Sequence, residues 1–317
     1  MFKILISDKL GEAGLAMLDK AADVAYDVKT GLSKEELLAI IPEYEGLIIR
    51  SGTQVDADVL AAGGRLKVVG RAGIGVDNVN VEAATKQGVL VMNTPGSNSV
   101  ATAEQTMALM LAVTRHTVSA HNSLAAGEWN RAQFAGTELY GKVLGIVGFG
   151  RIGRLVAERA KAFGMTVLAH DPFVKAEEGA KLGVSLVDLD RVFSQADYLT
   201  LHTAVTPQTT KMINCPTLKK MKKGVIIINV ARGKLIDEAA LAEALQEGHV
   251  KAAALDVYAT EPPAADNPLL GLSNVLHTPH LGASTVEAQR NVASQIVGQV
   301  LDFLRGKETR NAVNKLP

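Results

Sequence analysis

Three polar side chains in the second half of the chain are of types that together carry acid–base chemistry. Arg232, Glu261 and His280 each come after a short apolar run that is typical of a buried strand. An arginine binds a carboxylate bidentately, and a histidine can take or return a proton near neutral pH. A neighbouring carboxylate orients the imidazole and favours its charged form. We therefore predict a substrate clamp, an orienting carboxylate and an acid–base group, with four rival histidines left open: His121, His170, His202 and His277.

A glycine pattern in the middle of the chain predicts a dinucleotide site. The apolar run 143–147 ends at Gly148, and G-x-G-x-x-G continues through Gly150 and Gly153 into a segment with helical spacing. In this context the glycines allow a tight turn and close approach of a pyrophosphate to the helix N-terminus. Asp171 lies 18 positions after Gly153, where a carboxylate accepts the ribose 2′-hydroxyl. We predict NAD, because a carboxylate repels the 2′-phosphate of NADP; the alternative is an aspartate that only forms a turn.

Two loops in the first hundred residues are candidates for binding an anion. Each begins with an arginine at the end of a strand-like run and continues into glycine: Arg50-Ser51-Gly52 and Arg71-Ala72-Gly73-Ile74-Gly75. Ligands of open α/β sheets sit beyond the carboxyl ends of the strands. The loops therefore offer arginines and backbone N–H groups to a substrate. The alternative is that both arginines are solvated side chains beside ordinary turns.

Alternating strand and helix patterns must position these residues, and such alternation indicates parallel sheets covered by helices. Strand-like runs fall at 3–7, 24–28, 46–50, 67–71, 89–93, 143–147, 165–169, 198–202, 225–230, 252–257 and 275–278. Helical patterns fall at 12–21, 33–41, 56–62, 80–87, 100–113, 152–163, 188–195, 237–247 and 284–304. Ser33 and Glu36 predict a capping box. No glycine fingerprint follows the run 3–7, so the nucleotide site is assigned to the second half.

Several other segments carry weaker expectations. The segment 100–113 is apolar nearly all round, which predicts a helix buried on most sides, between domains or between subunits. The following segment, 124–139, is polar and irregular, and we interpret its Trp129 as an interface anchor rather than a core residue. The lysines at 219, 220, 222 and 223 are typical of a solvated helix end, and Cys215 of a passive small residue.

Composition limits the classes of function. A chain of 317 residues suggests about two domains, and equal numbers of basic and acidic side chains, 33 each, give no field that favours nucleic acid or an anionic membrane. The single cysteine excludes an intrachain disulfide and a multi-cysteine metal site, and we expect no metal. Neither a signal-peptide pattern nor a long apolar run is present, so we expect a cytoplasmic protein.

The chain resembles the D-isomer-specific 2-hydroxyacid dehydrogenases from Lys3 to Asn314. The resemblance rests on four stretches: 145–153, 229–233, 254–263 and 279–285. It implies an α/β fold of two doubly wound parallel-sheet domains, in which a Rossmann cofactor domain (98–283) is inserted into a flavodoxin-like substrate domain (1–97 and 284–317). It also implies a homodimer or homotetramer built on the cofactor domains.

The resemblance implies roles for individual residues as well. Arg232 binds substrate, Glu261 is the carboxylate partner and His280 exchanges the proton. The cofactor contacts are Gly148, Gly150, Arg151, Ile152, Gly153, Asp171, Thr203, Val230, Ala231, Asp256, Gly282 and Ala283. The substrate contacts predicted from the two loops described above are Arg50, Ser51, Gly52, Arg71, Gly73, Ile74 and Gly75. Some relatives have threonine where this chain has Ile74, so only the backbone of that residue can contribute.

The expected reaction is the NAD-dependent oxidation of D-3-phosphoglycerate to 3-phosphohydroxypyruvate, which opens serine synthesis. A phosphorylated 2-hydroxy acid needs an added cation, and Arg50 stands where many glyoxylate reductases have an apolar residue. A glyoxylate or hydroxypyruvate reductase is the alternative enzyme, and an NADH-sensing corepressor of the same fold is the non-enzymatic alternative. Because the sequence ends at Pro317, shortly after a tail that leads into regulatory domains in longer relatives, we expect no feedback inhibition by L-serine.

Overall fold

A computed structural model describes residues 1–316, which divide into two compact units. Unit 1 comprises residues 1–98 and the segment that begins at Ser284, and unit 2 comprises residues 99–283. Both units are α/β folds with parallel sheets, which confirms the predicted fold class. None of the described helices is long and apolar enough to cross a membrane.

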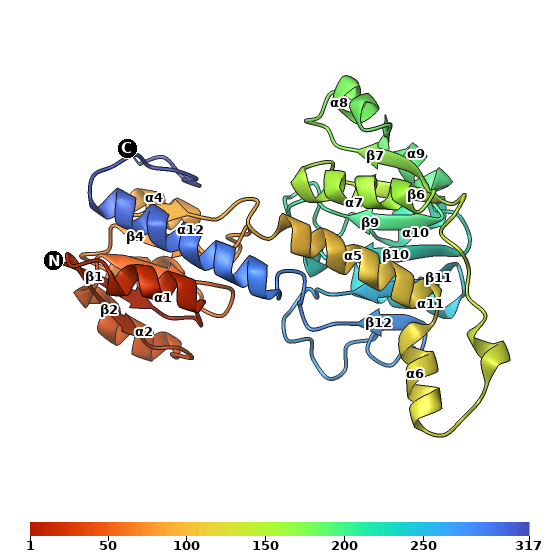
Figure 1. The fold of residues 1–317 in the computed structure, drawn as a ribbon, viewed down its shortest axis with the longest axis horizontal. Helices are drawn as coiled ribbons and strands as arrows, with labels where there is room; N and C mark the ends of the chain where they lie inside the picture. The colour runs from red at the N-terminus through yellow and green to blue at the C-terminus, as the bar shows by residue number, and fades with distance from the viewer. Residues whose placement is uncertain (317) are drawn as a thin grey trace. The chain divides into compact units, whose positions relative to one another are not determined.

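Unit 1 is built on a five-stranded parallel sheet (Figure 1). Its strands are β1 (Phe2–Ile6), β2 (Val24–Val28), β3 (Gly46–Ile49), β4 (Val68–Arg71) and β5 (Leu90–Met92). Their order, β2-β1-β3-β4-β5, is the doubly wound order of flavodoxin-like folds. β3 is buried along its whole length, as expected for a central parallel strand that is covered on both faces.

Helices cover both faces of this sheet. On one face α1 (Glu12–Asp19) lies beside the long helix α12 (Val286–Leu304), whose Ile296, Val297 and Val300 are fully buried (Figure 1). The other face is covered by α2 (Lys34–Ile40), the 3₁₀ turn η1 (Ile41–Glu43), α3 (Ala57–Ala62) and α4 (Val81–Lys86). The capping box predicted from Ser33 and Glu36 is confirmed at the start of α2.

Unit 2 contains a seven-stranded parallel sheet in the order β12-β11-β10-β9-β6-β7-β8. The strands are β6 (Val143–Val147), β7 (Thr166–His170), β8 (Ser185–Leu186), β9 (Tyr198–Leu201), β10 (Val225–Asn229), β11 (Val250–Leu255) and β12 (Val275–His277). The order reverses at β6, which is the first strand of the unit. Ligands of doubly wound folds bind at the carboxyl end of the sheet at such a switch point.

Two helical layers enclose this sheet. One contains α5 (Ser99–Thr114) and α7 (Arg151–Ala162), which lie side by side (Figure 1), and the other contains α9 (Leu189–Gln195), α10 (Cys215–Lys220) and α11 (Glu238–Gln246). A short helix, α8 (Ala176–Lys181), packs on β8. Neither α8 nor β8 was expected from the sequence. β11 also begins two residues before the predicted run.

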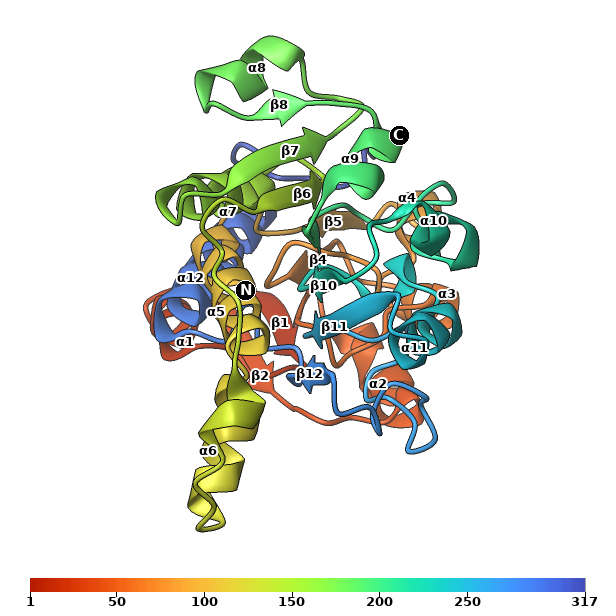
Figure 2. The same ribbon diagram turned by 90° about the vertical axis from the view of Figure 1, so that its right-hand side faces the viewer.

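The segment after α5 extends away from the rest of unit 2 (Figure 2). It consists of α6 (Thr117–Ala125), which has no buried residue, and the 3₁₀ turn η2 (Arg131–Phe134). The helix α6 begins before the segment that we expected to be irregular. Trp129 lies between the two and is 75% exposed, so it is outside the core of the unit, as predicted. α5 is buried over most of its length, also as predicted.

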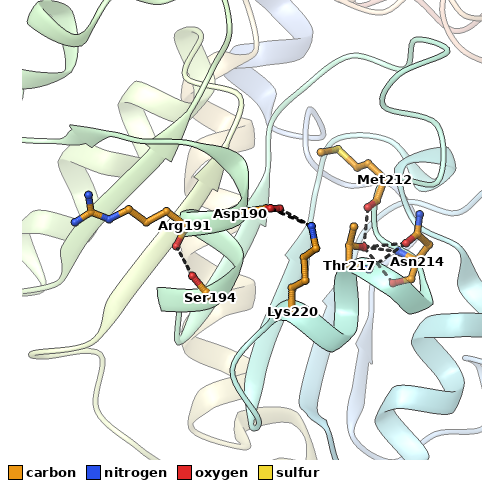
Figure 3. A network of polar contacts seen from close by, with 7 residues as sticks. All are labelled: Asp190, Arg191, Ser194, Met212, Asn214, Thr217 and Lys220. Carbon is orange, nitrogen blue, oxygen red and sulfur yellow. Dashed lines mark hydrogen bonds and ion pairs between the residues drawn. The ribbon is translucent and has the colours of Figure 1, made fainter.

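The basic cluster near the end of α10 makes ordinary surface ion pairs. Lys220 pairs with Asp190 of α9 at 2.8 Å, and Lys222 pairs with Asp197 at 3.0 Å. Figure 3 shows the first pair beside the capping bonds of Asn214 and Thr217 at the start of α10. Such exposed pairs contribute little to stability, and we find no function in the cluster. Cys215 is free and exposed.

Candidate functional site

The predicted acid–base residues come from three neighbouring strands of unit 2. Arg232 follows β10, Glu261 follows β11 and His280 follows β12, and these strands are adjacent in the sheet. The imidazole Nδ1 of His280 lies 2.5 Å from Oε2 of Glu261. Both side chains are more than one-third exposed, so the pair is open to solvent. This arrangement leaves Nε2 of His280 available to exchange a proton.

A buried carboxylate holds the loop that carries His280. Asp256 is fully buried, and its Oδ1 accepts hydrogen bonds from the Thr278 hydroxyl (2.5 Å) and the N–H of Leu281 (2.7 Å). Its Oδ2 accepts the N–H of Gly282 at 2.8 Å. Bonds on both sides of His280 explain how that residue keeps a left-handed backbone, with φ of 55°. Such conformations persist only where the surroundings impose them. Neither Thr278 nor this structural role of Asp256 was predicted from the sequence.

The carboxylate of Glu261 is held on its other oxygen. The N–H of Tyr258 donates to Oε1 at 3.1 Å. The backbone of Tyr258 lies so close to Gly233 that a Cβ on this glycine would be 1.8 Å from the Tyr258 carbonyl carbon. Gly233 therefore lets the loop of Arg232 pack directly on the residue that positions Glu261.

Electrostatics keep Glu261 ionised. Burial raises the pKa of its carboxyl, but the hydrogen bond and charge of His280, the N–H of Tyr258 and the charge of Arg232 outweigh burial. The pKa of Glu261 therefore lies below its ordinary value, and the group is a carboxylate throughout the neutral range. A charged carboxylate beside an imidazole favours the protonated imidazole.

The rival histidines have other environments. Burial lowers the pKa of His202 to about 3, so this side chain stays neutral. Burial also lowers the pKa of His277, whose Nδ1 lies 2.6 Å from the Tyr258 hydroxyl. The ring of His170 bonds to the carbonyl of Val187, and His121 is exposed on α6. Among these five histidines, only His280 forms an ion pair with a carboxylate in the described part of the chain.

A cavity of about 410 Å³ lies beside the His280–Glu261 pair. Its walls include both members of the pair and the largely apolar surfaces of Tyr258, Pro263 and Leu270. Burial, together with the negative charges of Glu238, Asp256 and Glu261, raises the pKa of Tyr258 to about 12, so its hydroxyl remains protonated. The Tyr258 hydroxyl therefore adds no charge to the wall of this cavity.

The glycine turn after β6 has the geometry required by a dinucleotide. Gly148 has φ of 95°, and a Cβ there would lie 2.5 Å from the carbonyl oxygen of His202. A Cβ on Gly153 would lie 2.2 Å from the carbonyl oxygen of Gly148, so the helix packs closely on the turn. Gly150 is exposed with open space around it, and no side chain caps the N-terminus of α7. The first N–H groups of α7 can therefore hold a pyrophosphate.

Asp171 lies beside this turn. Its Oδ2 accepts the N–H of Phe149 at 2.8 Å, and its Oδ1 accepts the N–H of Phe173 at 2.9 Å. Each carboxylate oxygen keeps a further lone pair for a ribose hydroxyl. The residues present therefore fit NAD.

The other predicted cofactor contacts lie at the carboxyl ends of the same strands. Arg151 and Ile152 open α7, and a Cβ on Gly148 would approach the backbone of Thr203 to 2.9 Å. Gly282 is packed so closely that a Cβ would lie 2.9 Å from Val230 and 3.3 Å from Asp256. Ala231 and Ala283 neighbour these residues in the chain. The predicted cofactor contacts therefore fall into two groups. One surrounds the glycine turn after β6, and the other lies on the loops after β10 and β12.

The predicted substrate loops follow two adjacent strands of unit 1. Arg50, Ser51 and Gly52 come after β3, and the loop of Gly73, Ile74 and Gly75 follows Arg71 at the end of β4. The guanidinium of Arg71 lies against Gly73, where a Cβ would be 1.5 Å from Nη1. The N–H of Gly73 bonds to the carbonyl of Arg71 at 2.9 Å, so it is not the bare donor that we expected.

No cluster of side chains that could hold a metal ion exists among residues 1–316.

Comparison with known proteins identifies the family. Residues 107–282 match the D-isomer specific 2-hydroxyacid dehydrogenase, NAD binding domain, family. A protein from Synechocystis named D-3-phosphoglycerate dehydrogenase is 49% identical over 99% of this chain. The chain spans 56% of the length of that relative.

Solved structures share the complete fold. The TT0316 protein of Thermus thermophilus has a TM-score of 0.91 and 38% identity, covering 98% of this chain and all of the other. A glyoxylate reductase from Paecilomyes thermophila has a TM-score of 0.89 and 31% identity, covering 98% of this chain and 97% of the other. The fold and the matched NAD-binding domain are shared with nicotinamide-dependent dehydrogenases. The chain belongs to the D-isomer-specific 2-hydroxyacid dehydrogenase family, and the expectation of an NAD-binding domain is confirmed.

The geometry of Asp171 predicts a preference for NAD over NADP in kcat/KM. Asp171→Ala should narrow that preference by about 10- to 150-fold, because a hydrogen bond to a charged group contributes roughly 1.5–3 kcal/mol. Asp190→Ala, which removes another exposed carboxylate of unit 2, is the matched control and should leave the preference unchanged. Steady-state kinetics with both cofactors measure the ratio of kcat/KM for NAD to kcat/KM for NADP. Equal use of the two cofactors by the unmodified protein would rule out this role for Asp171.

Proposed function

We propose that this protein oxidises D-3-phosphoglycerate to 3-phosphohydroxypyruvate with NAD. The observation that carries the chemistry is the 2.5 Å hydrogen bond between His280 and Glu261, with Arg232 contributing its charge to the same site. Support for the substrate comes from Arg50 and from the name of the Synechocystis relative, which describes that protein. Because the chain spans little more than half of that relative, the activity itself is part of the proposal.

In this proposal each residue performs a separate task. Arg232 binds the substrate carboxylate through its planar guanidinium. Nε2 of His280 accepts the proton of the 2-hydroxyl group while Glu261 holds Nδ1 and stabilises the imidazolium that forms. NAD, when bound, supplies the acceptor for the hydride that leaves C2. Loss of one proton and one hydride converts the alcohol into the 2-oxo acid, and the same groups work in reverse for reduction.

The cofactor roles follow from the turn after β6. We assign the pyrophosphate to the turn of Gly148, Gly150 and Gly153 and to the first residues of α7, and the ribose to Asp171. The residues around Val230 and Gly282 lie at the carboxyl ends of β10 and β12, where the remainder of the cofactor is expected. Asp256 contributes there mainly by holding the backbone, since it already accepts three hydrogen bonds.

A glyoxylate or hydroxypyruvate reductase is the second candidate. Its support is the TM-score of 0.89 with the glyoxylate reductase of Paecilomyes thermophila. The acid–base pair serves either reaction, so the pair does not separate the two. Arg50 favours the phosphorylated substrate, because a dianionic phosphate requires cations and glyoxylate has no second anionic group.

We also propose that the protein is a homodimer or homotetramer that works in the cytoplasm. Support for self-association comes from the projecting segment 117–134, which carries exposed Val118, Leu124 and Trp129. Exposed aromatic and aliphatic side chains on one segment are typical of a protein interface. Support for the cytoplasmic location comes from the NAD-binding domain.

The acid–base assignment predicts that His280→Ala lowers kcat by about 10²–10⁴-fold, the usual contribution of general acid–base catalysis. Glu261→Gln should also lower kcat, by less than His280→Ala does, because a neutral amide stabilises the imidazolium less than the carboxylate that lies 2.5 Å from Nδ1. His249→Gln is the control, since that ring bonds only to the carbonyl of Leu218 in the described bonds. A near-normal kcat for His280→Ala would transfer the role to another group.

The substrate assignment predicts that Arg50→Ala loses about 10- to 150-fold in kcat/KM for 3-phosphoglycerate, the equivalent of one charged hydrogen bond. Glycerate, which lacks the phosphate, should be a poor substrate and change little. Arg65→Ala removes an exposed arginine of unit 1 that pairs with Glu45 and serves as control. The change in NADH absorbance measures kcat/KM for each of four substrates: 3-phosphoglycerate, glycerate, glyoxylate and hydroxypyruvate. An equal loss for glycerate and 3-phosphoglycerate would favour the reductase.

The interface assignment predicts that Trp129→Ala weakens self-association about 30-fold or more, as expected when an interface hot spot worth about 2 kcal/mol is truncated. Sedimentation at several concentrations measures the dissociation constant. Phe173→Ala, which removes an aromatic side chain of unit 2 that is 93% exposed, is the control. A monomeric unmodified protein, or an unchanged dissociation constant, contradicts the prediction.

A further inference from the structure

The loop of Arg50 is fixed by two side chains that come from other parts of unit 1. Oδ2 of Asp8 accepts hydrogen bonds from the N–H groups of Arg50 (2.6 Å) and Thr53 (3.1 Å). Nδ2 of Asn78 donates to the carbonyl oxygens of the same two residues, at 2.8 and 2.7 Å. One carboxylate oxygen and one amide nitrogen therefore bind both ends of a four-residue loop.

The sheet topology brings Asp8 to this position. Asp8 comes shortly after β1, and β1 lies next to β3 in the parallel sheet, so both strands end at the same edge. The approach of Asp8 is close enough to require glycine at position 52, because a Cβ there would lie 2.6 Å from Oδ1 of Asp8. The Ser7 hydroxyl also lies 2.8 Å from the Thr53 hydroxyl. The loop thus packs tightly on the end of β1.

Asn78 ties the loop to the neighbouring strand. It belongs to the segment after β4 that also contains Gly73, Ile74 and Gly75, so it links the two predicted substrate loops. Its own backbone carbonyl accepts the N–H of Val55 at 2.8 Å, which holds the asparagine in place. Both hydrogen atoms of the amide are used, because Nδ2 has two and donates to two carbonyls.

These bonds leave a defined set of groups for a ligand. Arg50 and Thr53 have their N–H groups taken by Asp8, whereas the N–H groups of Ser51 and Gly52 donate to no acceptor in the bonds described for residues 1–316. Ser51 and Gly52 are exposed, and Arg50 is partly exposed. Consecutive backbone N–H groups beside an arginine form a site suited to an anion.

We propose that Asp8 and Asn78 are positioning residues that hold the Arg50–Thr53 loop in the conformation that binds the substrate phosphate. This inference rests on the proposed function, since it takes the phosphate as the group bound by Arg50. Asp8 contributes by accepting two N–H groups that would otherwise be free to rotate away. Asn78 contributes by holding the two carbonyl groups, which would repel a phosphate, in hydrogen bonds on the protein side.

The test is a double-mutant cycle between Asp8→Ala and Arg50→Ala. Asp8→Ala should raise KM for 3-phosphoglycerate about 10-fold, the loss of one charge-assisted bond, with kcat little changed. Its effect on glycerate should be less than about twofold. In the Arg50→Ala background, Asp8→Ala should add little, because residues that act through one another are not additive. Asp8→Asn retains an acceptor oxygen and should restore most of the affinity.

A second readout does not depend on catalysis. Amide hydrogen exchange at Arg50 and Thr53 should be faster in Asp8→Ala than in the unmodified protein, because both N–H groups lose their acceptor. Glu45→Ala is the matched control: Glu45 is a buried carboxylate of unit 1 that accepts the N–H of Lys3 at 2.7 Å, before β3 rather than after it. This variant should lower thermal stability and leave KM for 3-phosphoglycerate unchanged.

The outcomes separate the two proposals. If the unmodified protein oxidises glycerate as well as 3-phosphoglycerate, the proposed substrate is wrong and the inference fails with it. If the unmodified protein prefers 3-phosphoglycerate but Asp8→Ala lowers kcat/KM equally for both substrates, only the inference is overturned. It is also overturned if the effects of Asp8→Ala and Arg50→Ala are additive, or if Glu45→Ala raises KM as much as Asp8→Ala does.

Discussion

The geometry of the candidate catalytic pair depends on the hydrogen bonds that the buried carboxylate of Asp256 accepts. Burying a charge is costly unless hydrogen bonds replace its hydration, and Asp256 obtains three from the segment 278–282. The same bonds constrain the backbone on either side of His280 and keep this residue in a left-handed conformation. The same three hydrogen bonds therefore stabilise the buried carboxylate of Asp256 and fix the backbone that carries the imidazole of His280.

Unit 1 uses the same physical solution with different residues. Asp8 follows a strand and binds the backbone N–H groups of a loop after the adjacent strand, as Asp256 does for the loop after β12. In both units the ends of parallel strands leave polar backbone groups that must be satisfied. A carboxylate placed there satisfies several N–H groups at once and leaves the loop side chain, the exposed His280 or the partly exposed Arg50, available for a ligand.

Much of this architecture could be predicted from residue patterns. Strand and helix runs were recognisable because apolar residues mark buried strands and amphipathic helices, and Ser33 with Glu36 identified a capping box. The turn of Gly148, Gly150 and Gly153 was recognisable because any such fold requires glycine at these positions for steric reasons. Pairing of Glu261 with His280 was expected from the chemistry, and the structure places the two side chains in contact.

The remainder depends on contacts between residues that are distant in the chain. Asp8 and Arg50 are 42 positions apart, and no local pattern marks an aspartate that binds another loop. The bond between the N–H of Gly73 and the carbonyl of Arg71 is a detail of backbone conformation that the glycine alone does not reveal. α8 and β8 were missed because both are short and lie at the edge of the sheet, where few apolar residues are needed.

The proposed catalytic residues and the proposed phosphate-binding loop belong to different units of the chain. Arg232, Glu261, His280 and the glycine turn all belong to unit 2, and the hydrogen bonds described for the acid–base pair come from residues of the same unit. The loops of Arg50 and Gly73 belong to unit 1, and their conformation is set by Asp8 and Asn78 of that unit. Under the proposed function, substitutions in the unit 1 loops are expected to change the choice of acid more than the proton and hydride chemistry. Such a division is consistent with one fold serving relatives named for phosphoglycerate and for glyoxylate.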